Sequence, residues 1–202
     1  MAIAMNKLRG AELKGVEWMK VSKEKAAENR ERILDEAARL FREKGAQGVG
    51  VDALGEAAGL THGSLYSQFG SKDRLLAEAV GHAFSRFAAK FGAVKDADTY
   101  VRKYLSTEHR ENPGSGCTVA AIGSEMPRQS EAVRRAFTDA TKRSMARMAA
   151  LLPSRRGRER EDDALVMLAT MAGAMILARA VNDRELSDRI LSVSRAQLQR
   201  VA

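Results

Sequence analysis

Few side chains in this 202-residue sequence carry reactive groups: one cysteine, Cys117, and three histidines, His62, His82 and His109. The histidines are scattered along the chain and lack the paired spacing of a zinc site. The sequence also has no glycine-rich phosphate-binding loop and no convincing pairing of a nucleophile with a base. It therefore predicts no metal site, no cofactor and no enzymatic activity.

Cys117 follows the glycine-rich loop 111–116 and stands where a helix over residues 117–126 is expected to begin. The positive end of a helix favours the thiolate, which is the reactive form that a sensor of electrophiles or oxidants needs. A free cysteine is also a common small apolar core residue. The sequence gives the helix position but not the exposure, so both interpretations remain open.

A second chemically capable set of residues is compact and polar and lies within residues 61–72. Residues 62–69 form a short helical pattern in which Leu65 and Phe69 face inward. His62 offers a donor or an acceptor to a base edge, and Gly63 allows close approach of the backbone to DNA. The outward-facing residues are Thr61, His62, Ser64 and Ser67. This composition is suited to the major groove, and no arginine is placed to read a guanine.

Two short helices must position these side chains. Residues 51–58 are helical by the spacing of their apolar residues, and Gly59 stands where a residue of positive φ ends a helix. Thr61 is a natural N-cap for the second helix. The small residues Gly55 and Ala58 let the two helices cross closely. The spacing fits a helix-turn-helix, and it also fits an ordinary corner between two helices.

The segment 58–75, AGLTHGSLYSQFGSKDRL, resembles the signature of TetR-type (TetR/AcrR) transcriptional regulators, and the resemblance extends over about residues 29–80. In that family a small residue and a glycine precede a capped recognition helix with the pattern Gly-x-Leu-Tyr-x-x-Phe, followed by a lysine and a leucine. The resemblance implies an all-α homodimer with an N-terminal DNA-binding domain and a C-terminal ligand-binding and dimerisation domain. It also implies that Tyr66 and Lys72 contact DNA phosphate.

The sequence departs from the family pattern just before the first helix of the motif. Family members commonly carry hydroxyl residues at the positions of Val49 and Gly50, where they help to hold a phosphate. Gly50 still leaves the amides of the helix start free for a phosphate, so it remains a candidate DNA contact. The resemblance therefore implies that side chains contribute less to binding of the DNA backbone at this point.

The formal net charge of +8 suits a nucleic-acid partner, but it is not concentrated on the motif. Residues 1–90 carry 15 Lys and Arg against 12 Asp and Glu, and residues 91–202 carry 19 against 14. DNA contact must therefore rely on a few placed groups and helix starts. The single cysteine, the absence of a bilayer-length apolar run and the absence of a secretory signal predict a soluble cytoplasmic protein without a membrane partner.

The chain is predicted to be all-α, with a flexible leader over residues 1–20, a DNA-binding domain over 21–90 and a ligand-binding and dimerisation domain over 91–202. Helices are expected over residues 22–44, 51–58, 62–69, 71–91, 97–110, 117–126, 130–152, 162–181 and 184–201. The last two expose apolar stripes, that of the last helix at near-heptad spacing, so they are expected to form a four-helix interface between two chains. Packing within one chain is the alternative.

The resulting hypothesis is a homodimeric repressor that binds a palindromic operator and is released by a small-molecule inducer or by modification of a thiol. A helical sensor or interaction dimer that keeps the helix-turn-helix without binding DNA is the alternative. The candidate inducer pocket is lined by aromatic residues, methionines and the cysteine: Phe84, Phe87, Tyr104, Cys117, Met126, Phe137, Met148 and Met171. Each of these types is more often core than ligand contact.

Overall fold

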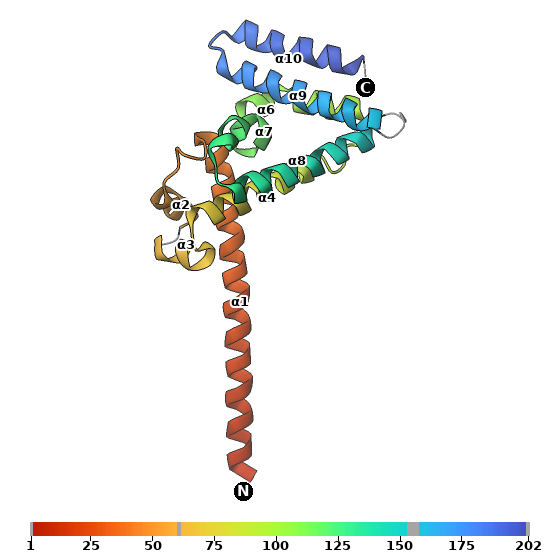
Figure 1. The fold of residues 1–202 in the computed structure, drawn as a ribbon. Coiled ribbons are helices and arrows are strands. Elements are labelled where there is room, and N and C mark those ends of the chain that lie inside the picture. The colour runs from red at the N-terminus through yellow and green to blue at the C-terminus, as the bar shows by residue number, and fades with distance from the viewer. Residues whose placement is uncertain (1, 60–61, 153–157, 201–202) are drawn as a thin grey trace.

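A computed structural model describes residues 2–59, 62–152 and 158–200, with side chains from residue 23 onward apart from that of His62. These residues form helices and connecting turns, with no strand among them, as the sequence predicts (Figure 1). The helices are α1 (Ala2–Lys44), α2 (Val51–Ala58), α3 (His62–Phe69), α4 (Lys72–Lys90), α5 (Ala97–Tyr104), α6 (Thr107–Glu111), η1 (Pro113–Ser115), α7 (Thr118–Ile122), η2 (Gly123–Arg128), α8 (Glu131–Leu151), α9 (Arg158–Ala180) and α10 (Arg184–Gln199).

The predicted helix-turn-helix is present, with α2 and α3 at the predicted bounds. Gly59 ends α2 in the left-handed region, with φ of 63° and ψ of 37°. Ser71 starts α4, since its side chain accepts a hydrogen bond from the amide of Arg74. The predicted cap Thr61 lies outside the described residues. The predicted leader, residues 1–20, overlaps helix α1 from Ala2 onward, in a stretch whose side chains are not described, and its flexibility stays a prediction.

Two predicted helices are wrong in detail. Residues 97–110 do not form one helix, because α5 ends at Tyr104 and α6 starts after Ser106. The Ser106 hydroxyl accepts a hydrogen bond from the amide of His109 at 3.1 Å, which caps α6 and turns the chain. The predicted helix 117–126 is likewise divided into α7 and the 3₁₀ helix η2. This stretch of short helices crosses the molecule between α1 and α9 (Figure 1).

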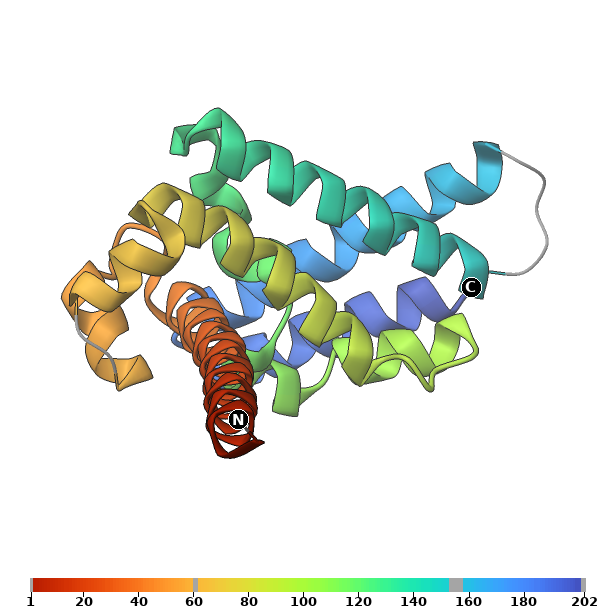
Figure 2. The ribbon, with the colours of Figure 1, turned by 90° about the horizontal axis from the view of Figure 1, so that it is seen from below.

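The long helices pack in pairs. Helix α4 leaves the helix-turn-helix and runs beside α8, and Figure 2 shows the two lying side by side. Helix α9 packs against both α8 and α10. By length and composition α9 is apolar enough to cross a membrane, but it contributes buried residues from Ala164 to Ala178 to the protein core. One face of α9 therefore belongs to the protein core, and its length and composition alone are weak evidence for a membrane span.

The buried side chains fall into two clusters. The first joins α1 to α4 with residues from η2 and α8, among them Met126 and Val133. The second joins α5 with α9, α10 and the far half of α8. Helix α4 contacts both, since Phe84 belongs to the first cluster and Phe87 packs against the second. A movement in the second cluster can therefore be transmitted through α4 to the helix-turn-helix.

Candidate nucleic-acid interface and ligand site

Helix α3 presents a small, polar outer face. Leu65 and Phe69 are buried, whereas Gly63 and Ser67 are exposed and Ser64 is half-buried. A Cβ atom at Gly63 would meet nothing within 4 Å, so its backbone is open to a partner. The Ser67 hydroxyl donates to the carbonyl of Ser64 at 2.9 Å. The first residue of the helix, His62, belongs to α3, although its side chain is not described.

Tyr66 and Lys72 lie together, one on α3 and the other at the start of α4. Tyr66 is 43% exposed. Both side chains line one small apolar hollow above Val51, Leu65 and Leu75. Lys72 opens α4, where backbone N–H groups without helical partners attract anions. The structure thus places a phenol hydroxyl, an ammonium group and a helix start on one surface, which is a suitable arrangement for a phosphate.

Gly50 caps α2 with an extended backbone but without a side-chain hydrogen bond. A Cβ atom at this position would meet nothing within 4 Å. Val49 is only 1% exposed and packs in the first core cluster. At positions 49 and 50 the start of α2 therefore offers a phosphate backbone amides but no side-chain hydroxyl, as expected from the sequence.

Helix α1 holds α3 in place through Arg30. Its guanidinium lies 4.2 Å from the centre of the Phe69 ring and donates to the carbonyl of Gln68 at 3.0 Å. It also forms an ion pair with Glu78 of α4. A second link between α1 and α4 joins Asp35 to Arg86, with the guanidinium Nε 2.8 Å from the carboxylate. These contacts fix the orientation of the recognition helix relative to the rest of the protein.

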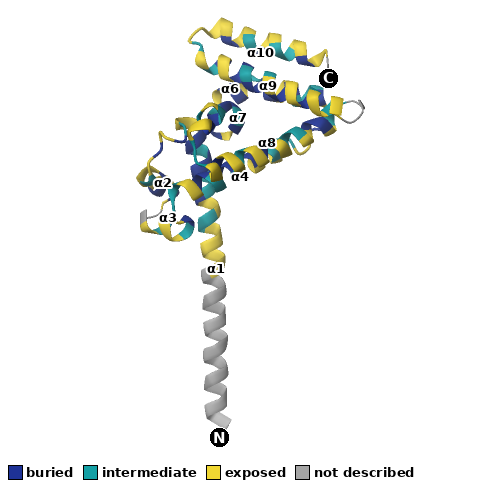
Figure 3. Ribbon diagram, in the orientation of Figure 1, coloured by how far each residue is buried: buried dark blue, intermediate teal, exposed yellow. Residues whose placement is uncertain are grey.

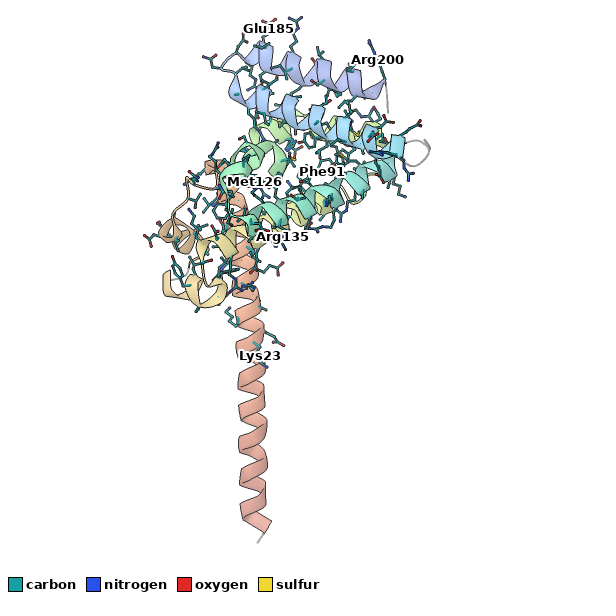
Figure 4. The ribbon with its side chains drawn as sticks, viewed as in Figure 1. Lys23, Phe91, Met126, Arg135, Glu185 and Arg200 are labelled. Carbon is teal, nitrogen blue, oxygen red and sulfur yellow. The ribbon has the colours of Figure 1, made fainter. Side chains whose placement is uncertain are left out.

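The eight residues predicted to line an inducer pocket are not brought together. Phe84, Met126 and Phe137 pack in or against the first core cluster, with the rings of Phe84 and Phe137 edge to face at 5.6 Å. The others, Phe87, Tyr104, Cys117, Met148 and Met171, pack in or against the second cluster. Figure 4 labels Met126, which lies in η2, and Phe91, which directly follows α4. These residues are mainly core packing, and their role as ligand contacts stays a prediction.

A groove of small-molecule size lies instead beside the last turns of α4, between that helix and the short segments α5, α6 and η1. It has a volume of about 620 Å³, within the range of small-molecule sites. Of the predicted pocket residues, only Phe87 lines it. We name it the α4–α6 groove. Sequence reasoning missed it because the groove forms where the chain turns at Ser106, inside the segment expected to be one helix.

His109 closes the inner side of this groove. Its Nδ1 lies 2.7 Å from the carbonyl of Tyr104, and its Nε2 lies 2.9 Å from the amide nitrogen of Cys117. A neutral ring with the proton on Nδ1 satisfies both, since Nδ1–H donates and Nε2 accepts. Burial lowers the pKa of His109 to about 4, and Arg179 and Lys90 act in the same direction against the bond to Tyr104. His109 is therefore uncharged near neutral pH.

Cys117 is only 4% exposed and packs in the second core cluster. Its amide is held by His109, as described above. This burial favours the interpretation of Cys117 as a small apolar core residue over that of a directly accessible thiol. Among the described residues, no group of three or more histidines, cysteines and carboxylates is placed to hold a metal ion.

The segment that runs from α6, which carries His109, to η1 is hydrogen-bonded to both halves of the molecule. From α1, Arg42 donates from Nε to the carbonyl of Gly114 at 2.8 Å. From α9, Arg179 donates from Nη2 to the carbonyl of His109 at 2.6 Å. Burial lowers the pKa of Arg42 to about 10. In addition, the Glu125 carboxylate accepts the amide of Ala46 at 2.9 Å, just before α2.

These features define a helix-turn-helix DNA-binding protein with a second helical unit. Residues 33–79 match the model of the family described as bacterial regulatory proteins, tetR family. The chain is 31% identical over 175 residues to an uncharacterised HTH-type transcriptional regulator of Mycobacterium tuberculosis, covering 76% of this chain and 86% of that protein. It is 34% identical over 77 residues to the regulator AcrR of Shigella flexneri, covering 35% of this chain and 36% of AcrR. The chain belongs to the TetR family of DNA-binding transcriptional regulators, which are not enzymes.

Solved structures have the same fold. The reduced form of NemR from E. coli superimposes with a TM-score of 0.70 at 20% identity, covering 86% of this chain and 96% of NemR. A regulator from Saccharomonospora viridis in complex with choline gives a TM-score of 0.63 at 20% identity, covering 86% of this chain and 96% of that one. Because each likeness covers 86% of this chain, the shared fold is not confined to the helix-turn-helix.

Proposed function

We propose that this regulator is a repressor that binds a palindromic operator as a homodimer and is released by a small molecule. The observation that carries the proposal is the course of α4. Its first residue, Lys72, lies beside the recognition helix, and its last turns, with Phe87 and Lys90, form a wall of the α4–α6 groove. A ligand that moves this helix changes the spacing of two recognition helices in a dimer, and only the correct spacing fits both half-sites.

The outer face of α9 and α10 supports the homodimer. Six large apolar residues are exposed there: Leu165, Val166, Ile176, Leu177, Leu186 and Val193. Figure 3 shows exposed positions along these two helices, and Glu185 and Arg200, labelled in Figure 4, lie near the two ends of α10. Apolar area of this kind is usually buried against a partner. Two copies that pair through these helices would form a four-helix interface.

TetR-family regulators bind operator DNA as dimers and bind small molecules, and the neighbour from Saccharomonospora viridis holds choline. We carry the first two properties, together with the cytoplasmic location of the family, to this chain as part of the proposal. Choline itself is not carried over, because the structural likeness at 20% identity extends to the fold alone.

The test is specific binding to DNA selected from a random library, compared with binding to unrelated duplex. Replacing Tyr66 by alanine and Lys72 by glutamine should each weaken specific binding. Loss of the Lys72 phosphate contact should also lower the slope of log affinity against log salt by about 1. Lys142 is exposed on α8 and serves as the matched control, so its replacement by glutamine should leave the slope unchanged.

Two outcomes would contradict the proposal. Equal affinity for selected and unrelated duplexes would leave the alternative, a helical sensor or interaction dimer that has no operator. Binding that tolerates insertion of half a helical turn between half-sites would contradict a rigid palindrome-binding dimer, since the half-sites would then face opposite sides of the duplex.

Release by thiol modification is the second route, and the burial of Cys117 speaks against direct attack on the sulfur. Alkylation of the wild type, with Cys117→Ser as the control, tests this route. Release of DNA from the wild type alone would establish a thiol sensor. No release from either protein would leave a non-covalent ligand as the inducer.

A further inference from the structure

The walls of the α4–α6 groove differ in chemistry. One part is formed by flat rings: Phe87 and Phe91 lie with ring centroids 4.8 Å apart, and His109 lies 5.5 Å from Phe87. His109 adds no charge, because both ring nitrogens are engaged within the protein and burial keeps its pKa low. This part of the groove therefore suits a flat apolar body that packs against rings.

The other part of the groove is cationic. Lys90 of α4 and Lys103 of α5 both line it and are exposed, and no ion pair of either is present among the described residues. Arg102 lines it as well, although its guanidinium is 2.8 Å from the carboxylate of Asp98. Glu108 is the one acidic side chain among the lining residues described. The groove thus carries an excess of positive charge beside an aromatic wall.

We propose that the α4–α6 groove binds a small organic anion with a flat apolar body, such as an aromatic carboxylate or sulfonate. The rings of Phe87 and Phe91 would receive the apolar body, and Lys90 and Lys103 would receive the acidic group. The volume of about 620 Å³ accommodates a molecule of this size. This inference rests on the proposed function in one respect, since it identifies the anion with the ligand that releases DNA.

An occupant of the groove would touch both elements that hold the helix-turn-helix. One is α4, which carries Phe87 and Lys90, is followed directly by Phe91, and starts just after the recognition helix. The other is the loop that includes Asn112 and Ser115, which line the groove. Within that loop the carbonyl of Gly114 accepts the hydrogen bonds from Arg42 of α1. Displacing either wall would therefore change the position of α1 or α4 relative to the core.

The binding test uses a matched pair of fluorescent probes, 8-anilinonaphthalene-1-sulfonate and its neutral counterpart N-phenyl-1-naphthylamine, titrated into the full chain without DNA. The double variant Lys90→Gln/Lys103→Gln should weaken the sulfonate about tenfold, since two exposed charge pairs are lost, and leave the neutral probe unchanged. The control variant Lys95→Gln/Lys142→Gln removes the same charge from exposed residues outside the groove lining. It should leave both probes unchanged.

A third variant, Phe91→Leu, should lower the affinity for both probes, because it removes a ring from the apolar wall. Thermal melting of each variant establishes that it folds. The inference would be overturned if the lysine variant lost affinity equally for both probes. It would also be overturned if the control variant lost as much affinity for the sulfonate as the lysine variant does. So would binding of the sulfonate that none of the variants alters.

The same proteins in a mobility-shift assay separate this inference from the proposed function. Release of DNA by the sulfonate from the wild type, but not from Lys90→Gln/Lys103→Gln, would support both. Release from the two proteins alike would overturn the assignment of the groove while leaving the regulator intact. Absence of sequence-specific DNA binding, with the probe results as expected, would overturn the proposed function and leave the anion site standing.

Discussion

His109 is a buried histidine whose two ring nitrogens both take part in hydrogen bonds within the protein. The Nδ1–H group donates to Tyr104, and Nε2 accepts the amide of Cys117 at the start of α7. The aromatic ring of Tyr104 lies edge to face with it at 4.6 Å. The imidazole therefore joins α6 to α7 only in its neutral form, since a protonated ring has no acceptor for the Cys117 amide.

This arrangement predicts loss of stability in mild acid. The pKa of His109 is lowered from 6.5 to about 4 in the folded chain. As pH falls from about 6.5 to about 4, His109 becomes protonated in the unfolded chain but stays neutral in the folded chain. The free energy of unfolding therefore decreases through this window. The loss amounts to about 3 kcal/mol. Urea unfolding at a series of pH values measures it.

The variant His109→Gln is the control for this prediction, because its carboxamide can donate to Tyr104 and accept from Cys117 without titrating. Its stability should change less over the same pH window than that of the wild type. The same decline with pH in both proteins would show that other groups cause it. The lowered pKa of Asp35, caused first by its hydrogen bond with Arg86, acts at lower pH.

Gly50 gives a second prediction at the scale of the residue. Its φ of −78° and ψ of 161° suit any N-cap residue, and a Cβ atom there meets open space. Gly50→Ser should stabilise the protein by a few tenths of a kcal/mol, because the hydroxyl caps α2. It should also raise DNA affinity severalfold, because the hydroxyl adds a phosphate contact. Gly50→Ala adds the Cβ without the hydroxyl, and an equal gain in that variant would contradict the capping explanation.

At the scale of the helix, the sequence predicted best where local signals and packing agree. The bounds of α2 and α3 follow from Gly59 and from the inward spacing of Leu65 and Phe69. The break between α5 and α6 was missed because Tyr104 and Leu105 continue an apolar stripe. Ser106 followed by His109 was the signal available, but a serine within a helix is not by itself a stop.

Arg30 carries a prediction about helix placement. Arg30→Ala removes the contact with the Phe69 ring, the hydrogen bond to Gln68 and the ion pair with Glu78. Stability should fall by about 1–2 kcal/mol. Affinity for the selected DNA should fall on the order of tenfold, because α3 loses its support from α1 and an ordered recognition helix is part of the binding surface.

The salt dependence of DNA binding distinguishes this supporting role from a direct contact. If Arg30 only positions α3, the slope of log affinity against log salt should equal that of the wild type. A slope lower by about 1 would show that Arg30 contacts phosphate instead. Arg32→Ala is the matched control on α1, since Arg32 is exposed and, among the described residues, its side chain bonds only to nearby Asn29.

At the scale of the whole molecule, the predicted inducer pocket shows what the sequence could not supply. Aromatic residues and methionines at helical spacing look alike whether they fill a core or line a cavity. Phe84 and Met171 are core residues here, whereas Lys90 and Lys103, which line the groove, look like ordinary surface charges in the sequence. Their proximity depends on how α4 and α5 meet, which involves residues far apart in the chain.

The last prediction concerns assembly. Leu177 on α9 and Val193 on α10 are 55% and 60% exposed, so a charge at either position costs a single chain little. If the face is a dimer interface, Leu177→Glu and Val193→Glu would place charges in an apolar contact and should yield monomers in sedimentation experiments. Binding to a complete palindrome should fall toward that of one half-site, because two linked recognition helices bind far better than one. Ala132→Glu, on the exposed start of α8, is the control, and dimers that survive both interface variants would place the contact elsewhere.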